Sequence, residues 1–349
     1  MIRQKTKKIK LGNTFIGGDS KVSVQSMTNT DTRDKERTIN QIKSLEKAGC
    51  DIVRCAVPDM EACDAIKEIV KNVDIPVIAD IHFDYKLALK SIENGISGLR
   101  INPGNIGSKY KVEEIARSAK ASNIPIRVGV NSGSLSKDMM KKYGKVSSDA
   151  LVESALRHVS ILEEVNFNDI VISIKSSNVV QMIESYRKIS KVTNYPLHLG
   201  VTETGTYFKG TIKSSVGIGT LLMEGIGDTI RVSLTGDPVE EVKVGRQILK
   251  SCGLIKDGIE FISCPTCGRT EIDLINIANE VEKRLANTHK NIKVAVMGCV
   301  VNGPGEAREA DVGIAGGNGE GLIFKKGVIV KKVKEENLVE ALMEEIEKM

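Results

Sequence analysis

Three cysteines in the last quarter of the chain have the spacing of metal ligands. Cys264 and Cys267 are separated by two residues, and Cys299 follows in the stretch 298–306, which is rich in glycine and proline. The two thiolates of a Cys-x-x-Cys pair can reach one metal centre, and a third thiolate on a nearby loop supplies another ligand. The pattern therefore predicts a metal site in this part of the chain.

A fourth ligand is expected, because structural zinc sites and iron–sulfur clusters both normally use four. The candidates are Cys252, His289 and Glu306, of which Glu306 is the nearest to Cys299 along the chain. A carboxylate on iron would be a weak, exchangeable ligand, and catalysis at a cluster needs such a position. A zinc site and a redox-active dithiol are the alternatives.

Basic side chains recur within short β-branched runs in the first two thirds of the chain. They are Arg54, Arg100, Arg127, Lys175 and Arg231. An arginine inside an apolar strand is costly to bury unless an anion or a carboxylate pairs with it. These cations outnumber the carboxylates at the ends of the same strands. We therefore predict a cavity that binds phosphate or diphosphate, with a network of internal ion pairs as the alternative.

Other polar residues lie at the same strand ends. Asp80 and Glu203 are the carboxylates available for acid–base chemistry beside a bound anion, and His82 is a further candidate. The uncharged residues expected to line the site are Asn102, Asn131 and Ser233. Together these positions predict an active site in which cations hold the substrate and carboxylates move protons.

Eight strands separated by helical segments are expected to position these residues. The β-branched runs are Val22–Met27, Asp51–Val57, Ile75–Ile81, Gly98–Pro103, Ile124–Val130, Asp169–Lys175, Pro196–Thr204 and Thr229–Thr235. Between them, apolar residues recur at helical spacing, as at Ile39, Ile42 and Leu45. Eight βα units form a closed (β/α)8 TIM barrel, whose active site lies at the carboxyl ends of the strands. We assign residues 1–251 to this substrate-binding barrel.

Two segments interrupt or follow the barrel pattern. Residues 131–150 are rich in Ser, Gly and Lys and predict a mobile loop at the barrel mouth, with an ordinary surface insertion as the alternative. Residues 252–258 contain two glycines and are expected to form a linker. Residues 259–349 alternate strands and helices and predict a small α+β domain that carries the metal-binding cysteines.

Composition limits the classes of function. The 349 residues carry a net charge of +5, lack Trp, and contain only 6 Tyr and 6 Phe, so no nucleic-acid partner is expected. No window approaches ~18 consecutive apolar residues, and residues 1–12 lack the apolar region of a signal peptide. We therefore expect no membrane association and a cytoplasmic location.

Several motifs are those of one enzyme family. They are VQSMTNT at 24–30, LRINPG at 99–104, the Cys264/Cys267 pair, and GCVVNGPGE at 298–306. The chain resembles the 4-hydroxy-3-methylbut-2-enyl diphosphate synthases (flavodoxin/ferredoxin type) in their two-domain bacterial form. The resemblance covers nearly the whole chain, and the last motif is highly specific. It implies an iron–sulfur oxidoreductase with a [4Fe–4S] cluster on Cys264, Cys267, Cys299 and Glu306.

The resemblance also implies a reaction in isoprenoid biosynthesis by the methylerythritol phosphate pathway. The barrel would bind 2-C-methyl-D-erythritol 2,4-cyclodiphosphate. Two electrons from a flavodoxin or ferredoxin would open its ring and expel a hydroxyl group as water, giving (E)-4-hydroxy-3-methylbut-2-enyl diphosphate. In this interpretation the arginines and Lys175 hold the diphosphate, Glu203 is the candidate proton donor, and Asp80 and His82 position the diol.

Two other functions remain open. One is a lyase or aldolase acting on a phosphorylated sugar, with Lys175 forming a Schiff base and a zinc-stabilised second domain. It requires a desolvated lysine, whereas Lys175 is expected among arginines. The other is a metal-dependent RNA-binding protein that uses a basic run in the second domain, where no aromatic platform accompanies the charges. The residues of this run are Lys325, Lys326, Lys331 and Lys332.

The order of the elements predicts a head-to-tail homodimer. Each barrel helix runs antiparallel to its strand, so the last helix ends at the face opposite the active site, where the linker begins. The linker 252–258 reaches at most ~25 Å when fully extended. We therefore expect the cluster domain of one chain to cover the barrel mouth of the other.

Overall fold

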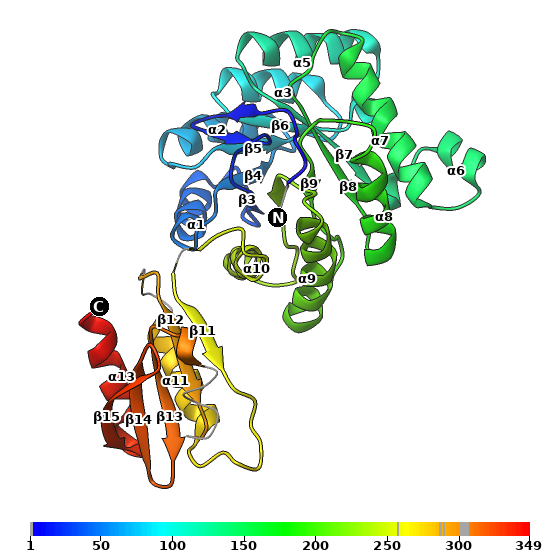
Figure 1. Cartoon of the computed structure of the whole chain (residues 1–349). Helices are drawn as coiled ribbons and strands as arrows, with labels where there is room; N and C mark the ends of the chain where they lie inside the picture. Colours follow the sequence, from blue (N-terminus) through cyan, green and yellow to red (C-terminus); the bar gives the residue numbers. More distant parts are fainter. Residues whose placement is uncertain (1–2, 257, 286–287, 289, 300–306) are drawn as a thin grey trace. The chain divides into compact units, whose positions relative to one another are not determined.

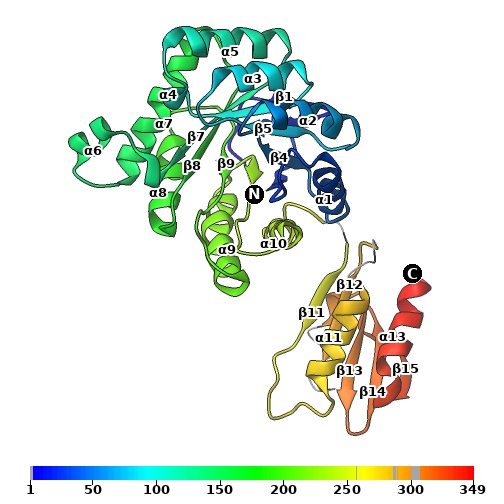
Figure 2. The same ribbon diagram turned by 180° about the vertical axis from the view of Figure 1, so that it is seen from behind.

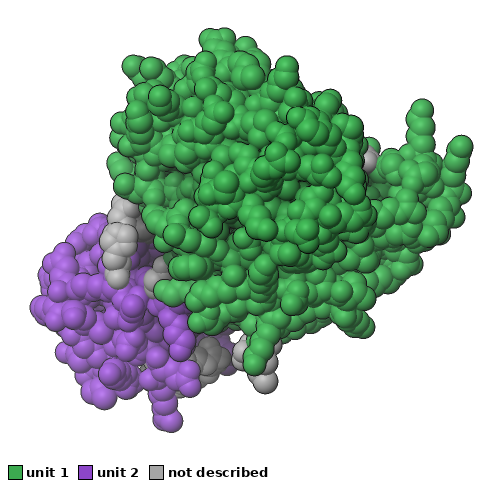
Figure 3. All heavy atoms as spheres, turned by 90° about the horizontal axis from the view of Figure 1, so that it is seen from above, with its two compact units in different colours: residues 1–254 green, residues 255–349 purple. Residues whose placement is uncertain are grey.

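The chain forms two compact units. The computed structural model describes residues 3–256, 258–285, 288, 290–299 and 307–349. Residues 1–254 make up the first unit and residues 255–349 the second, coloured separately in Figure 3. Within the described ranges, no helix is both long and apolar enough to span a bilayer.

The first unit contains eight parallel strands. They are β3 (Ser23–Met27), β4 (Ile52–Ala56), β5 (Val77–Asp80), β6 (Gly98–Ile101), β7 (Ile126–Asn131), β8 (Ile170–Lys175), β9 (His198–Leu199) and β10 (Thr229–Ile230). They pair in the order β8-β7-β6-β5-β4-β3-β10-β9. A parallel bridge between Ile172 and Leu197 joins β8 to the residue before β9 and closes the ring. The predicted TIM barrel is confirmed.

Helices surround the strands (Figures 1 and 2). They are α1 (Lys35–Lys47), α2 (Met60–Lys71), α3 (Tyr85–Glu93), α4 (Pro103–Ile106), α5 (Lys109–Ala121), α7 (Ser148–Glu163), α8 (Val179–Ile189), α9 (Tyr207–Met223) and α10 (Pro238–Ser251). Capping residues fix where several of them begin. The Asp34 and Asp59 side chains accept hydrogen bonds from backbone N–H groups in the first turns of α1 and α2. Asp237 does the same for α10, which starts with Pro238.

The segment after β7 differs from the prediction. Instead of a loop over residues 131–150, the structure has a short 3₁₀ turn (Ser132–Ser134) and helix α6 (Lys137–Tyr143), and α7 begins at Ser148. Met139 of α6 is buried, and Asp138 pairs with Arg157 of α7 at 2.6 Å. The Ser and Gly residues end the helical segments, and the Lys and Met residues between them form α6. The loop prediction was therefore wrong for most of this segment.

A hairpin near the N-terminus was not predicted. It consists of β1 (Ile9–Leu11) and β2 (Thr14–Ile16), and Gly12 in its turn has φ +57°. Ile9, Leu11 and Ile16 are buried in one cluster with three apolar residues at the amino ends of barrel strands. Those three residues are Ile52 of β4, Ile78 of β5 and Val171 of β8. The hairpin therefore closes the end of the barrel opposite the expected active site.

The second unit is a five-stranded sheet with helices. Its strands are β11 (Glu260–Ser263), β12 (Lys293–Met297), β13 (Val312–Gly317), β14 (Glu320–Lys325) and β15 (Val328–Lys334), paired in that order. The first three are parallel and the last two antiparallel. Helices α11 (Leu274–Leu285) and α13 (Leu338–Glu347) contribute to a common core with Val294, Val296 and Ile314. The predicted α+β domain is confirmed as a fold.

Replacement of Leu11 by alanine tests the closing role of the hairpin. Leu11 is 2% exposed, so Leu11→Ala leaves a cavity against the barrel strands, and we expect the free energy of unfolding to fall by about 2–4 kcal/mol. Urea unfolding followed by circular dichroism measures the change. Phe15→Ala is the control, because Phe15 lies in the same hairpin and is 45% exposed. Equal losses in both variants would contradict the closing role.

Candidate active site

Asp80 occupies the centre of a buried ionic cluster. It is the last residue of β5, and the register places it beside Arg100 of β6. Its Oδ1 accepts a hydrogen bond from Arg100 Nη1 at 3.2 Å, and its Oδ2 lies 3.6 Å from Arg54 Nε. His82 Nε2 lies 3.7 Å from the same Oδ2, with a side chain that is 58% exposed. Adjacent parallel strands thus bring three predicted residues around one carboxylate.

The environment of Asp80 fixes its charge. Burial by itself raises the pKa of the Asp80 carboxyl, but the charge of Arg54, the neighbouring His82 and the charge of Arg100 outweigh it and hold the pKa well below its ordinary value. Burial lowers the pKa of the Arg54 guanidinium to about 10, with Asp80 opposing the shift. Both groups therefore remain charged at neutral pH, and Asp80 is a hydrogen-bond acceptor rather than a proton source.

Arg127 and Arg231 have weaker counter-charges. Arg127 Nη1 donates a hydrogen bond to the side-chain oxygen of Gln25, a neutral partner. Burial lowers the pKa of Arg127 well below its ordinary value, and the charges of Arg54 and Arg100 lower it further. Arg231 Nη2 lies 3.5 Å from Glu241 Oε2. These two neighbouring guanidinium groups thus have one carboxylate partner, Glu241, between them.

Glu241 was missed by the sequence analysis. It is 5% exposed, and its Oε1 also accepts a hydrogen bond from the backbone N–H of Leu234 at 2.9 Å. It lies in the first turn of α10. The Asp237–Pro238 pair marks the start of a helix after β10, and the first turn of a barrel helix lies at the carboxyl end of the preceding strand. This pair could therefore have placed Glu241 at the site.

Lys175 is the last residue of β8 and is buried. Burial lowers the pKa of its ammonium group well below the ordinary value, and the charges of Arg231 and Arg54 lower it further. The expectation that a lysine among arginines is not desolvated was therefore wrong. A bound anion would reverse this effect, because negative charge beside Lys175 favours its protonated form.

The balance of charge in the barrel favours an anion. Among the described residues, the buried cations outnumber the buried carboxylates that contact them. The buried cations are Arg54, Arg100, Arg127 and Lys175, with the half-buried Arg231 beside them, and the carboxylates are Asp80 and Glu241. Guanidinium and ammonium groups in this arrangement suit the several oxygens of a phosphate or diphosphate.

The remaining predicted residues lie around the carboxyl ends of the strands. Asn102 follows β6, and its side chain accepts a hydrogen bond from the Gly104 N–H at 3.1 Å, which caps α4. Asn131 ends β7, and Ser233 lies three residues after β10. Glu203 is exposed and has φ +53°, in the left-handed region that is costly for a non-glycine residue. Such strain is typical of functional positions.

The second unit places two of the cysteines at one sheet edge. Cys264 directly follows β11 and Cys299 lies two residues after β12, and these strands are parallel neighbours. The Gly298 N–H donates a hydrogen bond to Cys264 Sγ at 3.1 Å. A hydrogen bond from the Arg269 backbone is the largest of several effects that lower the pKa of the exposed Cys267 thiol. These effects favour the thiolate form of Cys267.

The metal site itself is not assembled in the described residues. No three His, Cys, Asp or Glu side chains in those ranges are gathered closely enough to hold a metal ion. Glu306, the predicted fourth ligand, and His289, an alternative, lie outside the described residues. Cys252, the third alternative, follows the end of α10.

The fold and the site define a (β/α)8-barrel protein with a cationic cavity and a separate thiol-bearing α+β domain. Two family models match the chain: the GcpE TIM-barrel domain over residues 6–246 and the GcpE protein C-terminal domain over residues 260–348. The chain belongs to the GcpE family.

Curated relatives match over the whole length. A 4-hydroxy-3-methylbut-2-en-1-yl diphosphate synthase (flavodoxin) from Clostridium acetobutylicum is 75% identical and covers 100% of both chains. The enzyme of the same name from Clostridium perfringens is 72% identical over 99% of both. The family resemblance predicted from the motifs is therefore confirmed, and the chain is an enzyme of this family.

Solved structures share only the barrel fold. Yersinia pestis dihydropteroate synthase with a sulfonamide drug matches with a TM-score of 0.52 at 11% identity, covering 71% of this chain and 98% of the other. N-acetylneuraminic acid synthetase from Leptospira borgpetersenii matches with a TM-score of 0.51 at 14% identity, over 80% and 96%. These matches support the TIM barrel.

Neutralising Asp80 tests its role as the counter-charge of the cluster. Asp80→Asn leaves Arg54 and Arg100 buried without a carboxylate, so we expect the free energy of unfolding at pH 7 to fall by about 3 kcal/mol. The pKa of Asp80 is lowered by folding, so its contribution is present above the unfolded value of about 3.9. The difference between wild type and variant should therefore shrink as pH falls below about 4.

Phosphate and a surface variant provide the controls for this test. Inorganic phosphate should restore part of the stability lost in Asp80→Asn, because it supplies negative charge to the same guanidinium groups. Asp31→Asn removes an exposed carboxylate 2.7 Å from Arg33, and we expect a much smaller change that phosphate does not alter. Equal behaviour of the two variants would show that Asp80 does not organise the cluster.

Proposed function

We propose that the chain catalyses the reductive ring opening and dehydration of 2-C-methyl-D-erythritol 2,4-cyclodiphosphate to (E)-4-hydroxy-3-methylbut-2-enyl diphosphate. The observation that carries this proposal is the excess of buried cations at the carboxyl ends of the barrel strands. The cyclic diphosphate is an anion of the kind that such a cavity binds. The names of the full-length relatives support the same reaction.

The thiols of the second unit fit an iron–sulfur cluster. Cys264, Cys267 and Cys299 are free, the Gly298 N–H donates a hydrogen bond to Cys264 Sγ, and the lowered pKa of Cys267 favours its thiolate. We propose these three residues as ligands of a [4Fe–4S] cluster, with Glu306 as the fourth. Such a cluster, when bound, supplies electrons to the substrate one at a time.

The barrel residues would bind and orient the substrate. Arg100, Arg127 and Arg231 reach the cavity from β6, β7 and the end of β10, so the diphosphate would be held from several sides together with Arg54 and Lys175. Asn102, Asn131 and Ser233 would add hydrogen bonds. Binding of the anion favours the charged form of Lys175 and strengthens its contact with phosphate oxygens.

The proton for the departing hydroxyl group would come from Glu203. Asp80 is held ionised by Arg54 and Arg100, so its carboxylate would accept hydrogen bonds from the diol rather than donate a proton. His82, beside Asp80, would position the same hydroxyl groups. Glu203 is exposed, so it can recover a proton from water after each turnover.

The alternative of RNA binding is not favoured. Three of the four lysines in the basic run of the second unit form ion pairs with glutamates. The pairs are Lys325–Glu345 at 2.5 Å, Lys331–Glu344 at 3.2 Å and Lys332–Glu320 at 2.5 Å. Their charge is therefore largely balanced within the domain, and the sequence offers few aromatic rings for base stacking.

We further propose that the electron donor is a flavodoxin and that the working form is a head-to-tail homodimer. The relatives' names include flavodoxin. Helix α9 carries the exposed residues Phe208, Ile212 and Val216 at four-residue spacing, an apolar stripe on the barrel exterior that suits contact with a second copy. The short linker after α10 supports pairing of one chain's cluster domain with the other chain's barrel.

Turnover under anaerobic conditions tests the proposed reaction. Protein with a reconstituted cluster should show the brown colour of iron–sulfur centres and convert the cyclic diphosphate to the linear product when reduced flavodoxin is supplied, as measured by phosphorus NMR. Arg100→Ala should weaken substrate binding 10- to 100-fold, or about 1.5–3 kcal/mol for a lost charge-assisted hydrogen bond. Arg117→Ala, at an exposed pair with Glu114, should bind normally. A colourless, zinc-containing protein without turnover would refute the proposal.

Subunit complementation tests the homodimer. Arg100→Ala damages the barrel and Cys299→Ala damages the cluster domain. After subunit exchange, a mixed head-to-tail dimer has one site with both lesions and one with neither, so activity should reappear. Exchange is monitored by mass spectrometry of differently tagged chains. If mixed dimers form and remain inactive, each site is built within a single chain.

A further inference from the structure

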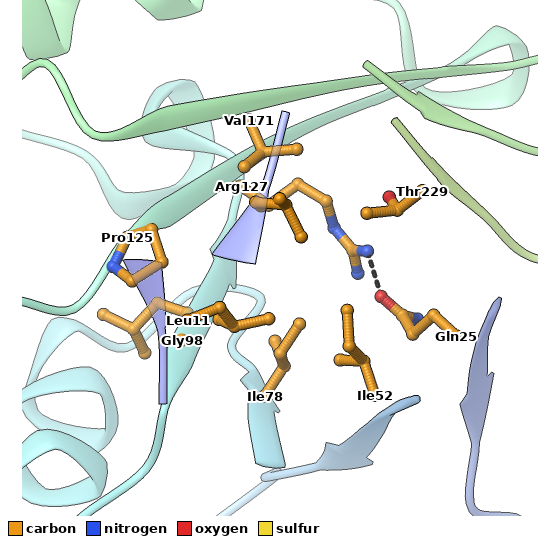
Figure 4. A pocket seen from close by; sticks show the side chains of 11 residues that line it. Leu11, Gln25, Ile52, Ile78, Gly98, Pro125, Arg127, Val171 and Thr229 are labelled. Atoms are coloured by element: carbon orange, nitrogen blue, oxygen red, sulfur yellow. Dashed lines mark hydrogen bonds between the residues drawn. The ribbon is translucent and has the colours of Figure 1, made fainter. Parts of the chain in front are cut away.

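A small cavity lies inside the barrel, between the closing hairpin and the cationic cluster. Its volume is about 20 Å³, enough for roughly one water or one small ion. Figure 4 shows apolar side chains, including Leu11, Ile52 and Ile78, on one side, and the hydrogen-bonded pair of Arg127 and Gln25 on the other. This space is below the anion site described above, toward the amino ends of the strands.

Two hydrogen-bond donors at this cavity lack partners. Gln25 is 2% exposed and Arg127 is 5% exposed, and neither Gln25 Nε2 nor Arg127 Nη2 has a hydrogen-bond partner. The other polar side chain that lines the cavity, Thr229, makes a 2.7 Å hydrogen bond between its Oγ1 and His198 Nδ1. Buried donors without acceptors cost free energy, so we expect the cavity to contain a hydrogen-bond acceptor for these two groups.

We propose that the cavity is a binding site for a monovalent anion of halide size. A halide only accepts hydrogen bonds, which is what Gln25 and Arg127 require, and its charge would offset that of Arg127. Among the described residues, no carboxylate forms an ion pair with Arg127. A water molecule fits less well, because buried waters typically make about three hydrogen bonds, and the side-chain oxygens that line this cavity, Gln25 Oε1 and Thr229 Oγ1, already take part in hydrogen bonds.

Arg127 would then contact both Gln25 and the halide. Its Nη1 is held by Gln25, and its Nη2 is free for the halide at the base of the barrel. The excess positive charge of the cluster above would add to the attraction, since four buried cations and the half-buried Arg231 face two carboxylates there. The hydrogen bond between Gln25 of β3 and Arg127 of β7, together with the hairpin that closes the barrel, therefore determines the position of this site.

Urea unfolding in chloride and in gluconate at equal ionic strength tests this proposal. Gluconate is too large for the cavity, so the unfolding midpoint should rise with chloride or bromide and not with gluconate. Val171→Ile is the matched variant, because it adds one methyl group to the cavity wall and changes no polar group. The halide dependence should be lost in Val171→Ile, while the variant folds and turns over substrate normally.

Crystals grown with sodium bromide provide an independent readout. An anomalous bromide peak within contact distance of Gln25 Nε2 and Arg127 Nη2 is the expected result. A peak at that place that vanishes in Val171→Ile crystals would link the ion to the solution effect. Equal unfolding midpoints in chloride and gluconate, or a halide dependence that survives in Val171→Ile, would overturn the proposal. So would bromide-grown crystals with a water molecule in the cavity.

Discussion

The barrel depends on one carboxylate that holds like charges together. Arg54 and Arg100 extend from strands on either side of β5, and two guanidinium groups in a buried space repel each other strongly. Asp80 lies between them within 3.2–3.6 Å and stays ionised because both are charged. The pairing of β5 with β4 and β6 therefore does two things: it places Asp80 between the two arginines, and it brings their positive charge into the cavity.

The closing hairpin leaves this cavity open at one end of the barrel only. Buried apolar residues of β1 and β2 fill the amino end of the barrel, so water and ions reach the buried cations mainly from the carboxyl end, where the polar side chains lie. Exclusion of water strengthens each electrostatic contact inside. It also lowers the pKa of Lys175, which makes the charge of the cavity respond to what binds there.

Sequence patterns predicted the barrel strands, the cationic residues and the sheet domain, because each leaves a local signal. A strand shows as a β-branched run, and an arginine inside one is conspicuous. The features that were missed depend on contacts between distant residues. Gln25 binds Arg127 102 positions away, and strands of three residues such as β1 and β2 are too short for a period-2 pattern. Glu241 lies on a helix, where a glutamate side chain is normally exposed to solvent, so no sequence pattern indicates that it is buried.

The two carboxylates assigned to the reaction differ in ways that only the fold determines. In the sequence, Asp80 and Glu203 are both acidic residues after a strand, and either is a candidate acid. In the structure, Asp80 is 4% exposed between two arginines, whereas Glu203 is exposed on a strained backbone position. A carboxylate held ionised by buried cations can orient hydroxyl groups but does not release a proton. This difference is the reason why we propose Glu203, which also has a strained backbone, rather than Asp80 as the proton donor.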